Sequence, residues 1–163
     1  MDLISETDPR LKLMSEDYDF QSTTLEERSS LVEQMFDTMV TNHGIGLAAP
    51  QIGINKRVFV MEVEGSRFPC FNPQIVEVLE ETEKAQEGCL SFPGLRMHVT
   101  RHSCIIGKFA DVHGNEVTRQ FKGLAARCFQ HELDHLNGVT FDSKVSKMAL
   151  DLAKKRRPKQ RNK

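Results

Sequence analysis

Apolar side chains recur with the period of an α-helix between residues 24 and 44. A helix that packs on a core carries apolar residues at i, i+3, i+4, i+7 and i+8. The positions that fit this spacing are Val32, Met35, Phe36, Met39 and Val40. Thr24 and Glu27 have the spacing of a capping box, in which two side chains bind backbone N–H groups at a helix start. We therefore predict a helix from Thr24, ended by Gly44.

The middle of the chain has the pattern of strands and turns. Residues 44–56 are rich in glycine and proline, which predicts a shaped loop with a short extended piece. Runs rich in β-forming residues at 57–63 and 71–80 predict strands, and residues 80–88 predict an acidic turn. Two further strands are predicted on either side of a turn at residues 113–115.

A second helix is predicted over residues 124–137, ended by Gly138. A short helix over residues 146–157 should end before Pro158, because the residue that precedes a proline disfavours helix. Strands that come before the second helix predict an α+β fold of one domain, with antiparallel or mixed sheets around that helix. We expect residues 1–142 to be catalytic and residues 143–163 to form a basic C-terminal helix and tail.

Composition limits the class of protein. The chain has 163 residues, of which 39% are hydrophobic, enough for one domain with a sizeable core. Residues 143–163 hold nine Lys or Arg and one Asp, whereas residues 1–142 carry a net charge of −9. The acidic start lacks a secretory signal and no segment approaches a membrane span. With four cysteines and no CxxC pair, we expect a reducing, cytoplasmic location and no membrane contact.

The sequence His131-Glu132-Leu133-Asp134-His135 has the spacing of a helical metal site. Residues i and i+4 share one face of a helix, so both imidazoles can bind one ion. Glu132 lies one position further round the helix, where it can act as a general base on a water molecule. The motif is short, and two histidines on a helix surface would give the same pattern.

A third ligand has to come from before this motif. The chain contains no His, Glu or Cys after His135, and only Asp142 and Asp151 remain as later carboxylates. Cys89 lies in a glycine-flanked segment and could approach the histidines, although a lone cysteine is also a common core residue. His98, His102 and His113 are rival ligands. Three protein ligands leave one position open, which is typical of a catalytic metal site.

Three segments together resemble the signature motifs of the peptide deformylase family. They are GIGLAAPQ at residues 44–51, EGCLS at residues 87–91 and HELDH at residues 131–135, in the family's order and spacing. The resemblance extends from about Asp8 to Phe141. It implies hydrolysis of the N-formyl group from the first methionine of nascent polypeptides, with release of formate.

The resemblance also implies the parts of the active site. It assigns one divalent metal ion to Cys89, His131 and His135, and catalysis to Glu132 with the Gln51 amide and the Leu90 backbone N–H. In cells the metal would be Fe(II), and Zn, Ni or Co could occupy the same ligands. Substrate contacts are expected from Gly44, Ile45, Gly46, Gly88, Arg96, Leu124, Arg127 and Cys128.

Several of these residues have a second interpretation. Ile45, Leu124 and Cys128 could form a pocket for the methionine side chain or belong to the core. Arg127 could border that pocket or be a solvated surface charge. Arg101 is expected to form a structural ion pair. His43 stands where an acidic residue is common in the family.

The expected partners are N-formylmethionyl nascent peptides. The basic residues 154–163 could contact ribosomal RNA, or form a solvated tail, as charge runs usually do. We expect a monomer. Two other functions fit the HExxH motif: an endopeptidase, disfavoured because its later third ligand is missing, and an inactive metal-binding module, disfavoured by the presence of Gln51, Cys89 and Glu132.

Overall fold

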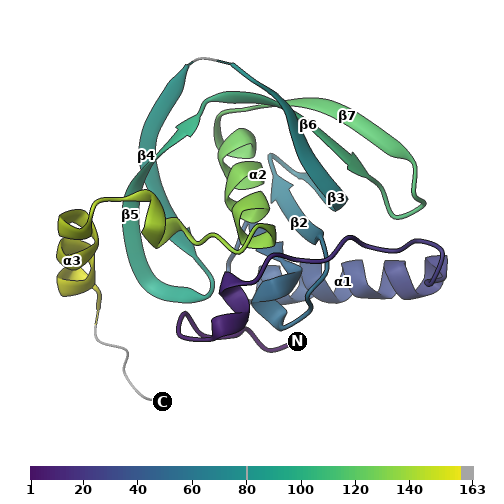
Figure 1. The fold of residues 1–163 in the computed structure, drawn as a ribbon, viewed down its shortest axis with the longest axis horizontal. Coiled ribbons are helices and arrows are strands. Elements are labelled where there is room, and N and C mark those ends of the chain that lie inside the picture. Colours follow the sequence, from purple (N-terminus) through teal and green to yellow (C-terminus); the bar gives the residue numbers. More distant parts are fainter. Residues whose placement is uncertain (80, 159–163) are drawn as a thin grey trace.

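The computed structural model describes residues 1–79 and 81–158 (Figure 1). The helices are α1 (Leu25–Thr41), α2 (Gly123–Leu136) and α3 (Lys147–Arg156), and the short 3-10 turns are η1 (Pro9–Lys12), η2 (Ala49–Ile52) and η3 (Phe141–Lys144). The strands are β1 (Gly46–Ala48), β2 (Val58–Val63), β3 (Ser66–Val78), β4 (Thr82–Cys89), β5 (Phe92–His102), β6 (Cys104–Ala110) and β7 (Glu116–Lys122).

The strands form two antiparallel sheets. One has the order β1-β2-β3-β6-β7, and the other is the β4–β5 hairpin. Helix α2 lies at the centre of the molecule, between the hairpin and the larger sheet (Figure 1). The α+β class, the antiparallel sheets and the single domain predicted from the sequence are confirmed.

Helix α1 covers one face of the larger sheet. Thr24 accepts a hydrogen bond from the N–H of Glu27, whose carboxylate accepts one from the N–H of Thr24, so the predicted capping box is present. Met35 and Met39 are fully buried, as the stripe requires, but Val40 is 50% exposed. The expectation that Val40 is buried was wrong. Val40 lies at the margin of the apolar stripe, and the spacing of apolar residues does not show how far the sheet extends over the helix.

The other face of the same sheet packs on α2. Alternate side chains of a strand point to opposite faces. Accordingly, Phe59 and Met61 of β2 join the core cluster that includes Phe129 of α2, whereas Val58 and Val60 join the cluster around α1. Burial on both faces explains why this strand has a nearly continuous apolar sequence.

The segment predicted as an acidic turn, residues 80–88, is mostly strand. Residues 82–89 pair with β5 from Thr82 opposite His102 to Cys89 opposite Phe92, while residue 80 lies outside the described residues. The prediction was wrong because the strand has one exposed side at the edge of a hairpin, where charged residues are common. Residues 82–89 form a strand because they pair with β5, which their own composition does not indicate.

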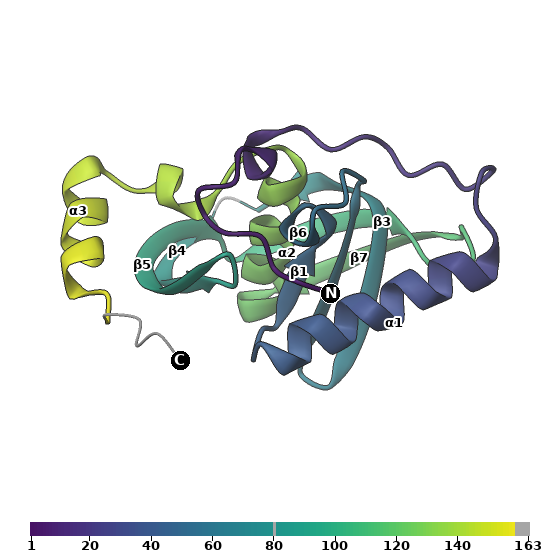
Figure 2. The ribbon, with the colours of Figure 1, turned by 90° about the horizontal axis from the view of Figure 1, so that it is seen from below.

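Helix α3 lies at the edge of the molecule beside β5, as Figures 1 and 2 both show. Leu150 and Ala153 of α3 pack against the third core cluster, which includes Leu11, Leu95 and Phe141. The predicted C-terminal helix is confirmed, and the basic residues 159–163 lie outside the described part of the chain. No helix among the described residues is long and apolar enough to cross a membrane.

Candidate active site

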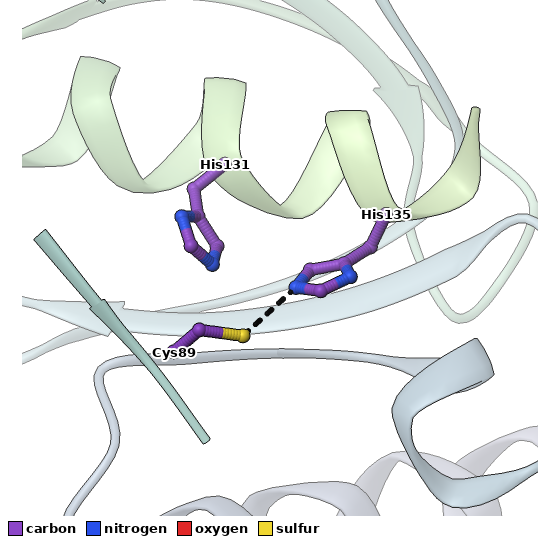
Figure 3. A group of neighbouring side chains, drawn as sticks. All are labelled: Cys89, His131 and His135. Carbon is purple, nitrogen blue, oxygen red and sulfur yellow. Dashed lines mark hydrogen bonds between the residues drawn. The ribbon is translucent and has the colours of Figure 1, made fainter. Parts of the chain in front are cut away.

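Three side chains from two elements converge between α2 and the β4–β5 hairpin. His131 and His135 lie one turn apart on α2, and Cys89 ends β4 (Figure 3). Their candidate ligand atoms all lie within 4.8 Å of one another, and Cys89 Sγ is 3.2 Å from His135 Nε2. Among the described residues, they are the one group of three or more His, Cys, Asp or Glu side chains with this arrangement.

The donor set fits a single transition-metal ion. Metal–sulfur bonds of about 2.3 Å and metal–nitrogen bonds of about 2.0 Å place tetrahedral ligand atoms roughly 3.5 Å apart. Burial and the nearby His131 hold the pKa of His135 well below its usual range, so this imidazole stays in the neutral form that binds metals. One thiolate and two imidazoles suit Zn, Fe, Co or Ni.

A buried carboxylate orients the first histidine. Glu87 Oε2 lies 3.0 Å from His131 Nδ1, which leaves His131 Nε2 for a metal. Glu87 also accepts hydrogen bonds from Arg101 at 2.9 and 3.1 Å. Burial opposes the ionisation of Glu87, but the bonds from His131 and Arg101 outweigh it and lower its pKa to about 2. The ion pair predicted for Arg101 is therefore confirmed, and it extends to Asp134.

Arg127 belongs to the same network. Its guanidinium donates to Glu87 Oε1 and to the Val99 carbonyl, each at 2.8 Å, and to the Glu83 carbonyl at 2.7 Å. The residue is 7% exposed, so a solvated surface charge is ruled out. Arg127 borders the cavity described below, but these bonds direct its charge toward the hairpin, and contact with a substrate stays a prediction.

Glu132 lies buried beside the ligands. Among the described residues its Oε2 has no hydrogen-bond partner. Burial raises the pKa of Glu132 to about 7, although the charge of His131 opposes this shift. A carboxyl group with such a pKa can exchange protons near neutral pH. Strand β1 passes so close that a Cβ on Gly46 would collide with Glu132 Oε1 and lie 2.7 Å from Cys128 Sγ.

Gln51 and Leu90 supply further polar groups next to Cys89. Gln51 Oε1 accepts a 2.8 Å hydrogen bond from the N–H of Ala48, which fixes the amide. Gln51 Nε2 then points toward Cys89 Sγ at 3.5 Å and Ser91 Oγ at 3.4 Å. Leu90 lies in the turn between β4 and β5. Among the turn and loop hydrogen bonds of the described residues, none uses the Leu90 N–H.

A cavity of about 580 Å³ opens beside these groups. Its lining includes all the residues predicted to contact substrate: Gly44, Ile45, Gly46, Gly88, Arg96, Leu124, Arg127 and Cys128. Ile45 is 43% and Leu124 is 53% exposed, so neither is a core residue. Cys128 is buried and belongs both to the core and to the cavity wall.

Some predicted residues lie apart from the site, and others were missed. His98 and His102 lie on β5, and neither joins the group of ligand atoms. Asp142 accepts a hydrogen bond from Thr140. Glu87 is present in the EGCLS segment, yet it received no role, because a carboxylate before a glycine gives no sign of its three buried partners. Ser91 and Asp134 were also missed, because their partners, Gln51 and Arg101, are distant in the sequence.

The fold and the site define a metal-dependent hydrolase: three ligands, a buried carboxylate beside them and an adjoining cavity. The model of the family described as polypeptide deformylase matches residues 1–150. A peptide deformylase of Thermotoga maritima is 45% identical over 121 residues, covering 74% of each chain. The chain therefore belongs to the polypeptide deformylase family, whose known role is the deformylation of nascent polypeptides.

Solved structures agree with this assignment. A peptide deformylase from Synechococcus elongatus, in complex with actinonin, superposes with a TM-score of 0.88 at 36% identity, over 96% of this chain and 85% of that chain. A second one from Thermotoga maritima gives a TM-score of 0.84 at 40% identity, over 89% of this chain and 97% of that chain. The family is metal-dependent, which agrees with the Cys89, His131 and His135 site.

Proposed function

We propose that this chain hydrolyses the N-formyl group of formylmethionyl peptides at the site between α2 and the β4–β5 hairpin. The observation that carries the proposal is the position of Glu132. Its carboxylate is buried, lies next to a metal ligand in sequence, and has one oxygen without a partner among the described residues. In this role Cys89, His131 Nε2 and His135 Nε2 would hold one metal ion, which would supply Lewis acidity toward a water molecule and the formyl group.

The chain's own groups supply the other steps. Glu132 Oε2 accepts a proton from the attacking water and then delivers it to the leaving amine, which releases formate and a free N-terminus. The developing negative charge on the formyl oxygen receives hydrogen bonds from Gln51 Nε2 and the Leu90 N–H. Losing one such donor typically costs about 3 kcal/mol of transition-state stabilisation.

The cavity supports the binding of a methionine side chain. Ile45 and Leu124 are exposed on its wall, and Cys128 is buried next to them. An apolar wall next to the catalytic groups suits the thioether chain of methionine. The glycines at 44, 46 and 88 border the same cavity, and a side chain at Gly46 would displace Glu132 and Cys128 from it.

One assay tests the proposal. Formyl-Met-Ala-Ser is offered to the purified protein, and the release of formate and of free amine is measured. We expect turnover that falls by at least about 100-fold in Glu132→Gln, with the metal content unchanged. Cleavage of internal peptide bonds would indicate an endopeptidase instead, and metal binding without any turnover would indicate an inactive module.

We further propose Fe(II) as the metal in cells, because thiolate and imidazole ligands accept it and the family resemblance implies it. Metal analysis of protein purified without air, compared with aerobic protein, tests this. Fe-loaded protein should lose activity in air through oxidation of the metal or of Cys89. Equal activity after both purifications would contradict it.

The basic residues 154–163 are proposed to contact ribosomal RNA, because the substrate is a nascent peptide that emerges from the ribosome. Lys154, Lys155 and Arg156 are exposed at the end of α3, and clustered positive charge binds phosphate without sequence preference. Cosedimentation with ribosomes should weaken as salt increases and should fall in a chain that ends at Asp142, which lacks the whole basic segment. We also propose that the enzyme acts as a monomer. A cytoplasmic location is proposed as well, and the free state of the four cysteines supports a reducing compartment.

A further inference from the structure

The N-terminal segment meets the residue that follows α3 at the wall of the cavity. Arg157 Nε donates a 2.7 Å hydrogen bond to the carbonyl oxygen of Pro93, and its second nitrogen donates a 3.0 Å bond to Glu6 Oε1. Pro93 belongs to the lining of the cavity. A single guanidinium therefore joins the N-terminal segment, the C-terminal helix and the β4–β5 hairpin, which are far apart in the sequence.

The part of the hairpin held by Arg157 is irregular. Gly88 pairs with Arg96, but the next residue, Cys89, pairs with Phe92, so residues 93–95 have no partners on β4. Gly94 has a φ of +77°, and a Cβ there would lie 3.6 Å from Arg157 Cγ. A bulge of this kind lacks the regular hydrogen bonds of a strand ladder. The bond from Arg157 to Pro93 therefore anchors a segment that the sheet itself does not hold.

The N-terminal segment also needs an anchor, because chain ends fray unless other contacts hold them. The N–H of Ile4 donates a 2.8 Å hydrogen bond to the carbonyl oxygen of Gln51, and Ile4 packs against the third core cluster. Two residues further along, Glu6 binds Arg157. These contacts hold Leu3 against the cavity, beside the turn that carries Gln51.

We propose that Arg157 is a positioning residue that holds residues 3–6 and 93–95 together as one wall of the substrate cleft. This wall contacts the peptide residues that follow formylmethionine, a statement that rests on the proposed function. A cavity of about 580 Å³ is large enough for more than one side chain. The wall with Ile45, Leu124 and Cys128 is assigned above to the methionine side chain, so the wall with Leu3 and Pro93 is left for the remainder of the peptide.

Three variants separate this role from a general effect of charge. Arg157→Met removes both contacts, Glu6→Gln removes the ion pair but leaves the bond to Pro93, and Arg156→Met is the matched control. Arg156 is the neighbouring exposed arginine, and among the described residues its side chain makes no ion pair. Each variant is assayed with formyl-Met-Ala-Ser and with formylmethionine amide, which lacks the later residues.

We expect Arg157→Met to raise KM for the tripeptide about fivefold, the change that corresponds to roughly 1 kcal/mol of lost binding energy. The kcat for the tripeptide and the kcat/KM for formylmethionine amide should stay within twofold. Glu6→Gln should raise KM less, and Arg156→Met should not change it. A lower kcat, an equal loss with both substrates, or the same loss in the Arg156 control would overturn the proposal.

Hydrogen exchange tests the same contacts without any turnover. The amide of Ile4 should exchange several-fold faster in Arg157→Met than in the wild type, and at the wild-type rate in Arg156→Met. Unchanged protection of Ile4 in Arg157→Met would show that Arg157 does not hold the segment. If the wild-type protein fails to deformylate the tripeptide, the proposed function is wrong, while the exchange measurement still reports on the contact.

Discussion

The helices α1 and α2 cover opposite faces of the same sheet, but they bury different chemistry. The side chains that α1 buries are mainly apolar, and Met35 and Met39 are almost fully enclosed. Helix α2 buries charged and polar side chains as well as Phe129 and Leu136: they are Arg127, Gln130, His131, Glu132 and His135. Polar groups are stable in a protein interior only when they have partners.

The partners of α2 come mainly from the β4–β5 hairpin. Glu87 on β4 binds His131 and Arg127, and the backbone of His102 on β5 exchanges two hydrogen bonds with Gln130. Helix α1 buries one charged side chain, Arg28, which donates hydrogen bonds to the carbonyl oxygens of Val112 and Thr23. Helix α2 instead needs a second element that supplies matching charges. One sheet therefore supports two different helices: α1 buries a mainly apolar face, and α2, on the other face of the sheet, buries the polar residues of the candidate active site.

The largest expected effect comes from Glu87→Gln. This change removes the negative charge that pairs with buried side chains of α2 and β5. Arg101 and Arg127 are then left buried with one fewer counter-charge. Removing one partner of a buried ion pair costs about 3–5 kcal/mol. Urea unfolding of the metal-free protein should show a loss of this size. A change below about 1 kcal/mol would mean that the carboxylate contributes little to packing the two elements together.

Met35→Ala tests the α1 side. Met35 is fully buried, and truncation of a buried methionine costs about 2–5 kcal/mol. Stability should fall by this amount, while kcat/KM of the folded enzyme should remain within twofold, because the opposite face of the sheet carries the site. Val40→Ala is the matched control on the same helix: with 50% exposure, it should change stability by less than about 0.5 kcal/mol. A large loss of kcat/KM in Met35→Ala would contradict the division between the two faces.

Arg127→Lys should weaken metal binding more than it weakens the fold. A lysine cannot replace the three hydrogen bonds that the guanidinium donates. Loss of a group that supports a metal ligand typically reduces metal affinity about 10–100-fold. Competition with a chelator measures this, with Arg119→Lys on β7 as control. Equal metal affinity in both variants would show that Glu87 holds His131 without help from Arg127.

The smallest expected effect is that of Thr24→Ala, which removes the capping box of α1. The loss of an N-cap side chain costs about 1 kcal/mol, because one backbone N–H at the helix start loses its partner. Thermal unfolding measures the change, and metal content and kcat should stay the same. If Thr24→Ala also lost metal, the two faces of the sheet would not be independent, which would contradict the comparison between α1 and α2.

Elements with strong internal signals were predictable from the sequence. The capping residues and the apolar period of α1 predicted its start to the residue, and the run of residues 57–63 predicted β2, which begins at Val58. Strand β4 was not predictable, because its identity depends on pairing with β5 and its exposed side tolerates charge. Burial of Val40 was not predictable either, since spacing indicates a helix face but not how far the neighbouring sheet extends.

The residues of the candidate site also include some that the sequence indicated and some that it did not. The HExxH spacing indicated His131 and His135, and the resemblance to the deformylase family selected Cys89 from several candidate third ligands. The structure brings the three side chains together. The role of Glu87 could not be read, because its partners come from β5 and from two turns of α2. The hydrogen-bond partners of Arg127 were not predictable either. Arg127 and His131 are four residues apart on one face of α2, but side chains with this spacing can contact different neighbours.

Cys89 and His135 are 46 residues apart in the sequence, so only the folded chain presents all three ligands at once. Metal binding and folding are therefore linked equilibria: an ion that binds the native state, and not the unfolded chain, shifts the population toward the native state. At a free metal concentration 100-fold above Kd, this linkage is worth about 2.7 kcal/mol. The melting temperature of this enzyme thus serves as a gauge of its metal occupancy.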